Sequence, residues 1–292
     1  MSRRLWILPH QSDHLLLGDI RAARQQRQTL HLWWLGQSGF LIQWEDQHLL
    51  LDPYLSDSLT RKYAGTDKPH VRISPLVIEP QRLNFIDLVT SSHNHTDHLD
   101  GETLQALLQE NPQLMIVVPA ANQDFAAERL QVSRQRLTPI DEGQTVTHRG
   151  FRLHAIPSAH ETVERDERGR CRYLGYVVQF GPWTVYHSGD TVRYEGLAER
   201  LKRWSIDVAL LPINGRLPSR RVAGNLWGAE AVELARDIGA RLVIPCHYHL
   251  FEFNSVEPDE FIAAANEQQQ PYRILQLGER LSLPTPTRTS PP

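Results

Sequence analysis

Cysteine is almost absent from this chain, and its scarcity excludes several classes of protein. Cys171 and Cys246 are the only two cysteines in 292 residues, and they lie far apart in the sequence. Two isolated cysteines match no zinc-finger spacing and do not build a disulfide-rich fold. The sequence therefore predicts a protein of a reducing compartment, and we expect it in the cytoplasm.

Long hydrophobic runs and an excess of one charge are missing as well. No stretch reaches the roughly 18 apolar residues that a membrane-spanning helix needs. The start, MSRRLWILPHQSDH, is basic, but its apolar run is too short for a signal peptide. The formal net charge is only −3, whereas nucleic-acid-binding proteins usually show a basic excess. We expect no membrane span and no nucleic-acid partner, while a homo-oligomer remains open.

The remaining composition is typical of a globular domain with a sizeable core. Hydrophobic residues make up 40% of the chain and charged residues 22%. No internal repeat or long linker divides the sequence, so we expect a single domain over residues 1–283. Residues 284–292 are rich in Pro and Thr, which predicts a disordered tail.

Short apolar segments bounded by turn residues predict many strands with helices between them. Strands are expected at 31–35, 39–44, 48–52, 86–93, 115–119, 151–157, 173–180, 183–189, 208–213 and 241–247. Helices are expected at 101–110, 194–204, 228–239 and 258–268. Asp100 and Asn225 stand where the first and third helices need N-caps, and Gly239 would end the third. Strands in two groups favour two sheets flanked by helices.

Histidine is the residue that stands out, with 14 copies, and three of them fall in SSHNHTDHLD at 91–100. Side chains alternate along an extended segment, so His93 and His95 share one face. Asp97 and His98 follow where the chain enters the expected helix, and a turn there would place them at a second point nearby. The segment can therefore supply two neighbouring metal ions. Imidazole suits zinc and iron, and carboxylate extends the choice to manganese.

Three further candidates each follow a predicted strand: His160, Asp190 and His247. Each alone has a plainer interpretation, as a loop histidine, a helix cap and a strand-end histidine. In this order and at strand ends, together with the first cluster, they indicate a metal site.

The series H-x-H-x-D-H, His160, S-G-D at 188–190 and P-x-H at 245–247 resembles the metallo-β-lactamase superfamily, from about Leu30 to Leu283. The resemblance implies an α/β protein of the α+β type, an αββα sandwich with two mixed β-sheets flanked by helices. It implies two divalent metal ions, zinc or manganese with iron as a further option. One ion would be held by His93, His95 and His160. The second would be held by Asp97, His98 and His247, with Asp190 bridging the two. No cysteine replaces Asp190, so the antibiotic-degrading branch is not favoured.

Two cations about 3.5–4 Å apart can share a hydroxide, because a bound water has a pKa near 7. The hydroxide attacks a carbonyl carbon or a phosphorus, and the cations stabilise the oxyanion that develops. We expect Asp97 to orient this hydroxide as well as to bind metal. His249 or Tyr248 would protonate the leaving oxygen, although packing is an equally simple role for either.

Residues 212–216, PINGR, and the later G-N and I-P-x-H resemble the L-ascorbate-6-phosphate lactonase branch, of the type called beta-lactamase superfamily domain 2. The segments WLGQSGFLI and LLLDPYLS fit this branch and a phospholipase D-like group that hydrolyses N-acylphosphatidylethanolamine. Arg216, with Arg220 or Arg221, would clamp an anionic phosphate or carboxylate. For Arg220 and Arg221 a solvated loop is the open alternative. Asn214 would fix the turn or contact substrate, and Asp52 would support a metal-binding histidine.

The sequence departs from the lactonase pattern at Cys246, where a small residue is expected, and in the charged hairpin at 163–175. We expect a metal-dependent hydrolase that opens a lactone or ester of a small anionic, sugar-phosphate-like substrate. The alternatives are a phosphodiesterase acting on a phospholipid or nucleotide, and a metal-binding protein without catalysis.

Overall fold

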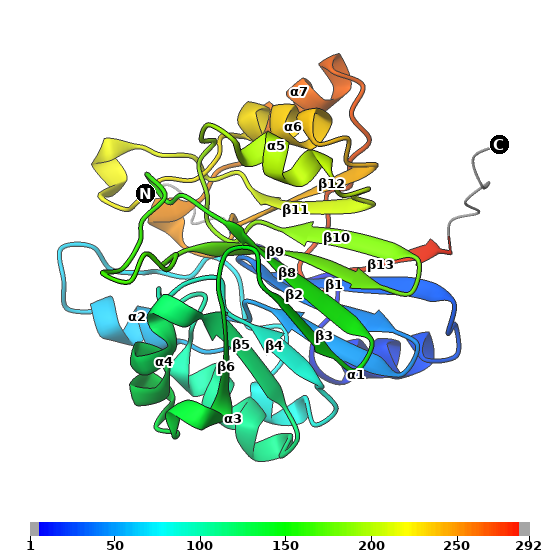
Figure 1. The fold of residues 1–292 in the computed structure, drawn as a ribbon, viewed down its shortest axis with the longest axis vertical. Helices are drawn as coiled ribbons and strands as arrows, with labels where there is room; N and C mark the ends of the chain where they lie inside the picture. The colour runs from blue at the N-terminus through cyan, green and yellow to red at the C-terminus, as the bar shows by residue number, and fades with distance from the viewer. Residues whose placement is uncertain (1–5, 286–292) are drawn as a thin grey trace.

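Two β-sheets lie face to face at the centre of the molecule (Figure 1). The computed structural model describes residues 6–285, so residues 1–5 and most of the tail expected at 284–292 lie outside it. The seven-stranded sheet has the order β13-β1-β2-β3-β4-β5-β6, and the six-stranded sheet has the order β12-β11-β10-β9-β8-β7. The strands of the first sheet are β1 (Thr29–Gly36), β2 (Gly39–Trp44), β3 (Gln47–Leu51), β4 (Leu88–Thr90), β5 (Met115–Pro119), β6 (Leu137–Ile140) and β13 (Arg280–Pro284). Those of the second are β7 (Thr145–His148), β8 (Phe151–Pro157), β9 (Leu174–Phe180), β10 (Trp183–His187), β11 (Val208–Pro212) and β12 (Leu242–Cys246).

Both sheets are mixed. In the first, the β13-β1-β2-β3 part is antiparallel, whereas the β3-β4-β5-β6 part is parallel. In the second, β7 to β10 pair antiparallel, whereas β10, β11 and β12 pair parallel. Parallel strands end at the same edge of a sheet, so the loops that follow β4 and the loops that follow β10 and β12 meet at one end of the sandwich.

Alternation along the strands builds two layers of core. In β1, Leu30, Leu32 and Trp34 join the cluster between the sheets. Trp33 and Leu35, which point the other way, pack under the helices of the first sheet. Since both faces of these strands are covered, they read as nearly continuous apolar runs rather than alternating ones.

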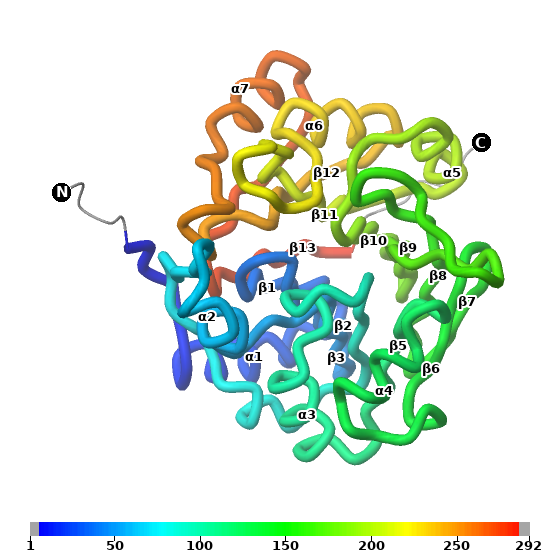
Figure 2. Tube along the Cα trace, turned by 90° about the vertical axis from the view of Figure 1, so that its left-hand side faces the viewer, coloured from blue at the N-terminus to red at the C-terminus, as the bar shows by residue number. Residues whose placement is uncertain are grey.

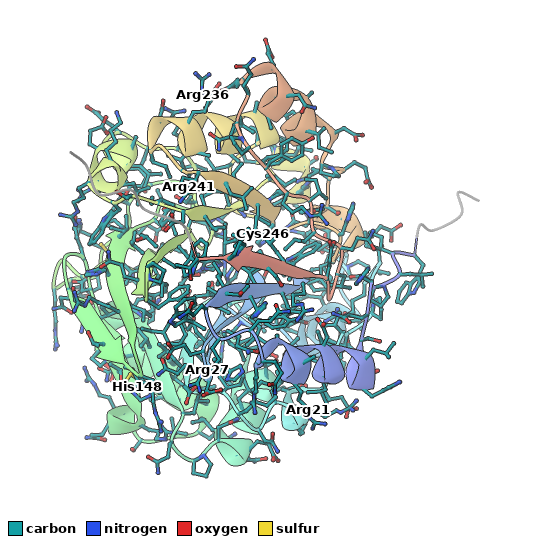
Figure 3. All side chains as sticks on the ribbon, turned by 90° about the vertical axis from the view of Figure 1, so that its right-hand side faces the viewer. Arg21, Arg27, His148, Arg236, Arg241 and Cys246 are labelled. Atoms are coloured by element: carbon teal, nitrogen blue, oxygen red, sulfur yellow. The ribbon has the colours of Figure 1, made fainter. Side chains whose placement is uncertain are left out.

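Helices cover the outer face of each sheet (Figure 1). The helices near the first sheet are α1 (Asp13–Ala23), α2 (Ser58–Tyr63), α3 (Gly101–Glu110) and α4 (Gln123–Leu130). Those over the second are α5 (Leu197–Lys202), α6 (Gly228–Asp237) and α7 (Asp259–Glu267). The tube in Figure 2 shows these two groups on opposite sides of the sheets. In Figure 3 the exposed side chains of Arg21 on α1 and Arg236 on α6 lie at opposite surfaces, whereas Cys246 on β12 lies in the interior.

The expected αββα arrangement is therefore confirmed, with local corrections. The helix expected at 101–110 has these bounds, and Asp100 caps it by accepting a hydrogen bond from the Thr103 N–H at 3.1 Å. The Asn225 cap was wrong, because Trp227 occupies the N-cap position of α6. Segment 86–93 forms strand only over Leu88–Thr90, since the residues after it turn toward the histidine cluster.

The charged segment at 163–175 does form a hairpin. Arg165 and Cys171 form an isolated antiparallel bridge, and Arg170 pairs with Asp166 at 2.6 Å. Strand β13 extends to Pro284, one residue into the segment expected as a tail. The single domain at 1–283 stays a prediction. Among residues 6–285 no helix has the length and apolarity to cross a bilayer.

Candidate metal centre

All seven residues expected to bind metal lie together at one end of the sandwich. His93, His95, Asp97 and His98 lie in the loop between β4 and α3. His160 follows β8, Asp190 follows β10 and His247 directly follows β12. The candidate ligand atoms of His93, His95, His160 and Asp190 lie within 4.8 Å of one another, and so do those of Asp97, His98 and His247. The structure therefore assembles two adjoining clusters from four separate parts of the chain.

Asp190 lies between the two clusters. Its Oδ2 is 3.3 Å from His160 Nε2 and 3.2 Å from His247 Nε2. Its Oδ1 is 3.2 Å from His98 Nε2. One carboxylate therefore contacts histidines of both groups.

The other ring nitrogen of several histidines is held by a neighbour. His98 Nδ1 lies 2.7 Å from the Asp52 carboxylate, and His160 Nδ1 lies 2.6 Å from the Gly224 carbonyl oxygen. His93 Nδ1 lies 3.0 Å from the Ser92 hydroxyl. A hydrogen bond to Nδ1 fixes the ring and leaves Nε2 to face the centre, as in metal-binding histidines. The contact expected between Asp52 and a histidine of the cluster is present.

Asp52 is itself fully buried and held in place. It accepts hydrogen bonds from the Ser92 N–H at 2.9 Å and the Thr90 hydroxyl at 3.3 Å. These bonds orient the carboxylate that in turn orients His98.

A glycine lets the Asp190 turn approach the histidine loop. Gly189 has a φ of +58°, and a Cβ there would lie 2.5 Å from Ser92 Cβ. Any other residue would be strained in this conformation and would push the two loops apart. His247 also has a left-handed backbone, with a φ of +62°. Such a conformation is strained for a residue other than glycine and persists only where the surrounding structure holds it.

The electrostatics favour cations at this centre. Burial lowers the pKa of His93 well below its ordinary value, and burial with the nearby His160 lowers the pKa of His95 to about 4. Burial opposes ionisation of Asp190, but His247 and His98 outweigh it and hold the pKa of that carboxyl well below its usual range. Neutral imidazoles and ionised carboxylates are the forms that bind metals.

His247 and His98 carry the opposite shift. Burial acts to lower the pKa of His247, yet Asp190 and Asp97 raise it to about 9. The same carboxylates raise the pKa of His98 well above its ordinary value against the effect of burial. Both shifts have the same cause, carboxylates that favour positive charge at these rings, and a metal ion would supply that charge.

Unpartnered buried atoms provide the test of whether these residues fit metal ions. His93 Nε2 is buried and has no hydrogen-bond partner among residues 6–285, and the buried pair His98 Nε2 and Asp190 Oδ1 lie 3.2 Å apart without being aligned for a hydrogen bond. Buried polar atoms are normally hydrogen-bonded. These atoms, in a donor set of imidazole and carboxylate, fit divalent cations of the zinc, manganese or iron type.

The centre opens into a cavity of about 600 Å³. Its lining includes five of the clustered residues: His95, Asp97, His160, Asp190 and His247. It also includes three cationic side chains, Lys62, Arg129 and Arg221. A volume of this size accommodates a small-molecule substrate.

Two expected substrate-site residues do not reach this cavity. Arg216 pairs with Glu230 at the start of α6, with two contacts of 2.6 Å, and is absent from the lining. Glu230 also accepts a hydrogen bond from the Trp227 N–H at 2.9 Å, so Arg216 ties the 216–225 segment to α6. Arg220 donates to the carbonyl oxygens of Asn214 and Ser255.

The expected proton donors are also outside the lining. His249 Nε2 lies 3.0 Å from the exposed carboxylate of Glu257. Tyr248 is buried and stacks on Trp34 at 5.0 Å between ring centroids. Asn214 is buried in a chain of amides between Asn225 and Asn254, which supports a role in fixing the turn.

Sequence reasoning missed Gln37, which lies in the turn between β1 and β2. Its Nε2 donates a hydrogen bond to Asp97 Oδ2 at 2.7 Å and lies 3.1 Å from His247 Nε2. It also missed Tyr173 and His70, which line the cavity. The only signal for Gln37 was its place between Gly36 and Gly39, where the turn returns to the strand-end edge.

Known proteins resemble this chain in both sequence and fold. A model of the family described as "Beta-lactamase superfamily domain" matches residues 47–248. A UPF0173 metal-dependent hydrolase of Sulfurisphaera tokodaii is 24% identical over 256 residues, covering 86% of this chain and 99% of the relative. One of Opitutus terrae is 28% identical over 258 residues, covering 87% of this chain and all (100%) of the relative.

Solved structures share the fold. The metallo-beta-lactamase fold protein YhfI from Bacillus subtilis superposes with a TM-score of 0.63 at 19% identity, covering 87% of this chain and 99% of that chain. An isothiocyanate hydrolase from Delia radicum gut bacteria superposes with a TM-score of 0.69 at 16% identity, with the same coverage of 87% and 99%. At these identities the likeness shows the fold alone.

Proposed function

The chain belongs to the beta-lactamase superfamily domain family, and on this premise we propose that it is a metal-dependent hydrolase whose active centre is the paired His and Asp cluster. The observation that carries the proposal is the convergence of seven imidazole and carboxylate side chains, buried or half-buried, in two clusters whose ligand atoms lie within 4.8 Å of one another. In our assignment His93, His95 and His160 would hold one divalent ion. Asp97, His98 and His247 would hold the other, and Asp190 would be shared by both.

When bound, two divalent ions lower the pKa of a shared water to about 7 and stabilise negative charge that develops on the substrate. The protein's own groups supply orientation. Gln37 holds one oxygen of Asp97, which leaves the carboxylate positioned to accept a hydrogen bond from the attacking water. Asp52 holds the ring of His98, so that the cluster keeps its shape through the reaction.

We propose an anionic substrate, because the cavity has cations at its walls. Apart from Asp97 and Asp190, no acidic residue among those described lines it, whereas Lys62, Arg129 and Arg221 do. The ammonium group of Lys62 lies over the Tyr63 ring at 5.2 Å. The anion clamp expected of Arg216 is thus assigned to this set instead.

The reaction that we favour is the opening of a lactone or ester of a small anionic substrate, of the sugar-phosphate type implied by the lactonase resemblance. Phosphodiester hydrolysis is the alternative, since the same pair of ions serves either reaction. A metal-binding protein without catalysis is the third hypothesis. The open cavity beside Asp97 and Asp190 argues for catalysis, because a purely structural metal site is closed.

Hydrolysis by the protein reconstituted with manganese or zinc tests the proposal. The panel contains a sugar-phosphate lactone and a generic phosphodiester, with Asp97→Ala as the inactive variant and Asp46→Ala, in an exposed ion pair with Arg27, as the matched control. Lactone opening that falls about 100-fold or more in Asp97→Ala alone supports the proposal. Phosphodiester cleavage alone supports the alternative, and no hydrolysis with either metal contradicts both.

A further inference from the structure

Four rings that contact one another are part of the cavity lining, and we call them the aromatic wall: Tyr63, His70, Phe251 and Phe253. His70 stacks on Tyr63 with ring centroids 4.2 Å apart. It meets Phe251 and Phe253 edge-on, at 5.2 and 4.6 Å. The two phenylalanine rings are nearly parallel, with 26° between their planes. The four rings therefore fix one another's orientation.

The wall joins two parts of the chain that are far apart in sequence. Tyr63 ends α2 and His70 lies in the loop after it, whereas Phe251 and Phe253 lie at the short helix Glu252–Asn254 beyond β12. Backbone hydrogen bonds hold the two parts side by side, from Ile73 N–H to the Leu250 oxygen and from Glu252 N–H to the Val71 oxygen, both at 2.9 Å. These backbone hydrogen bonds therefore fix the position of the wall in the fold.

The wall offers the cavity apolar ring surface and few polar atoms. Cations lie over two of its rings, the Lys68 ammonium over Phe253 at 4.9 Å and the Lys62 ammonium over Tyr63 at 5.2 Å. His70 Nδ1 lies 3.1 Å from the Lys68 carbonyl oxygen and must donate to it, so Nε2 carries no proton in the neutral ring. Burial keeps the pKa of His70 below its ordinary value, although Asp97 acts in the opposite direction.

The lining of this one cavity therefore combines two unlike groups, and this difference carries the inference. The first group is the metal-binding cluster and the second is the aromatic wall, and Lys62, Arg129 and Arg221 also line the cavity. Resting on the function proposed above, we infer that the aromatic wall binds a planar, apolar group attached to the anionic substrate. An aromatic ring that stacks on another ring, or meets it edge to face, contributes more binding free energy than the burial of its area alone. Tyr63, His70 and Phe253 then determine specificity.

Two phosphonates that differ only in the apolar group provide the test. Phenylphosphonate and methylphosphonate carry the same charged head for the metal ions, and calorimetry of the metal-loaded protein measures their Kd values. Burial of a phenyl ring predicts that phenylphosphonate binds about tenfold or more tightly in the wild type. Phe253→Ala and Tyr63→Leu should reduce this ratio to about threefold or less, with the Kd of methylphosphonate unchanged.

Phe85→Ala is the matched control. Phe85 is also half-buried, meets the edge of His48 at 4.8 Å and carries the Arg24 guanidinium at 5.3 Å, but it does not line the cavity. This variant should keep the wild-type ratio. If Phe253→Ala fails to fold, Phe253→Leu keeps apolar volume while removing the ring and should still lower the ratio.

The outcomes separate this inference from the proposed function. Equal affinity for the two phosphonates in the wild type, or a ratio that survives in both wall variants, overturns the inference and leaves the metal centre standing. Failure of both phosphonates to bind overturns the metal centre as an anion acceptor and the inference with it.

Discussion

The amide of Gln37 donates a hydrogen bond to Asp97 Oδ2 across 2.7 Å. Gln37 has a φ of +51°, in the turn between β1 and β2, and its carbonyl oxygen accepts a hydrogen bond from the His247 N–H at 2.9 Å. The β1–β2 turn of the first sheet therefore contacts two candidate metal ligands, Asp97 in the loop after β4 and His247 after β12. This residue links the two sheets at the point where the chemistry is proposed.

Replacing Gln37 should weaken the centre without unfolding the protein. Gln37→Leu removes the hydrogen bond to Asp97 and should lower metal affinity by about 10- to 100-fold, as is typical when a group that orients a ligand is lost. Metal titration by calorimetry measures the change. Gln105→Leu, on the half-buried Gln105 that bonds the Leu130 oxygen on α4, is the control and should bind metal as the wild type does. Unchanged affinity in Gln37→Leu would refute the role.

Replacing Arg221 should affect substrate binding, whereas replacing Arg216 should affect stability. Arg221 lines the cavity, its side chain is 57% exposed, and its partner Asp67 at 2.8 Å is 77% exposed, so the pair is weak. Arg221→Gln should raise KM for an anionic ester by about threefold and leave a neutral ester unaffected. Arg216→Gln breaks the pair with Glu230 and should lower stability rather than change the preference for anions. Steady-state kinetics on the matched ester pair, with thermal unfolding of each variant, distinguish the two. A selective KM effect in Arg216→Gln would return the anion clamp to that residue.

His48 should make the fold sensitive to acid. Burial, with a smaller contribution from Arg24, lowers the pKa of His48 from 6.5 to about 3. Between these values the unfolded chain takes up a proton that the folded chain does not, so stability falls as the pH drops through this window. The slope is at most about 1.4 kcal/mol per pH unit. His48→Gln cannot titrate, so urea unfolding of the metal-free variant at pH 7 and pH 5 should show a smaller loss than the wild type. An equal loss would show that His48 is not the sensor.

The sequence predicted what local pattern determines. The α3 helix and its Asp100 cap depend on neighbours within one turn, and the structure has both as expected. The positions of His160, Asp190 and His247 followed from one rule, that side chains after strands collect at one sheet edge. Asp52 was placed correctly because LLLDPY ends a strand at that same edge.

What the sequence did not predict depends on partners distant in the chain. Arg216 was expected at the substrate, but Glu230 on α6 lies closer and holds it. His249 was expected near the centre because it follows His247 by two residues, yet the left-handed φ of +59° at His249 accompanies a side chain turned toward Glu257. The aromatic wall forms because the loop after α2 lies beside the loop after β12. No local pattern in the sequence indicates that contact.

Metal stoichiometry tests the central claim most directly, because it asks whether the seven residues form two adjoining sites. Elemental analysis of the dialysed, reconstituted protein should find about two ions per chain in the wild type. His95→Ala and His247→Ala should each retain about one, and Asp190→Ala should retain fewer than two, with hydrolysis lost in all three. A wild type that binds no metal, or variants that still bind two ions and hydrolyse substrate at the wild-type rate, would contradict the account.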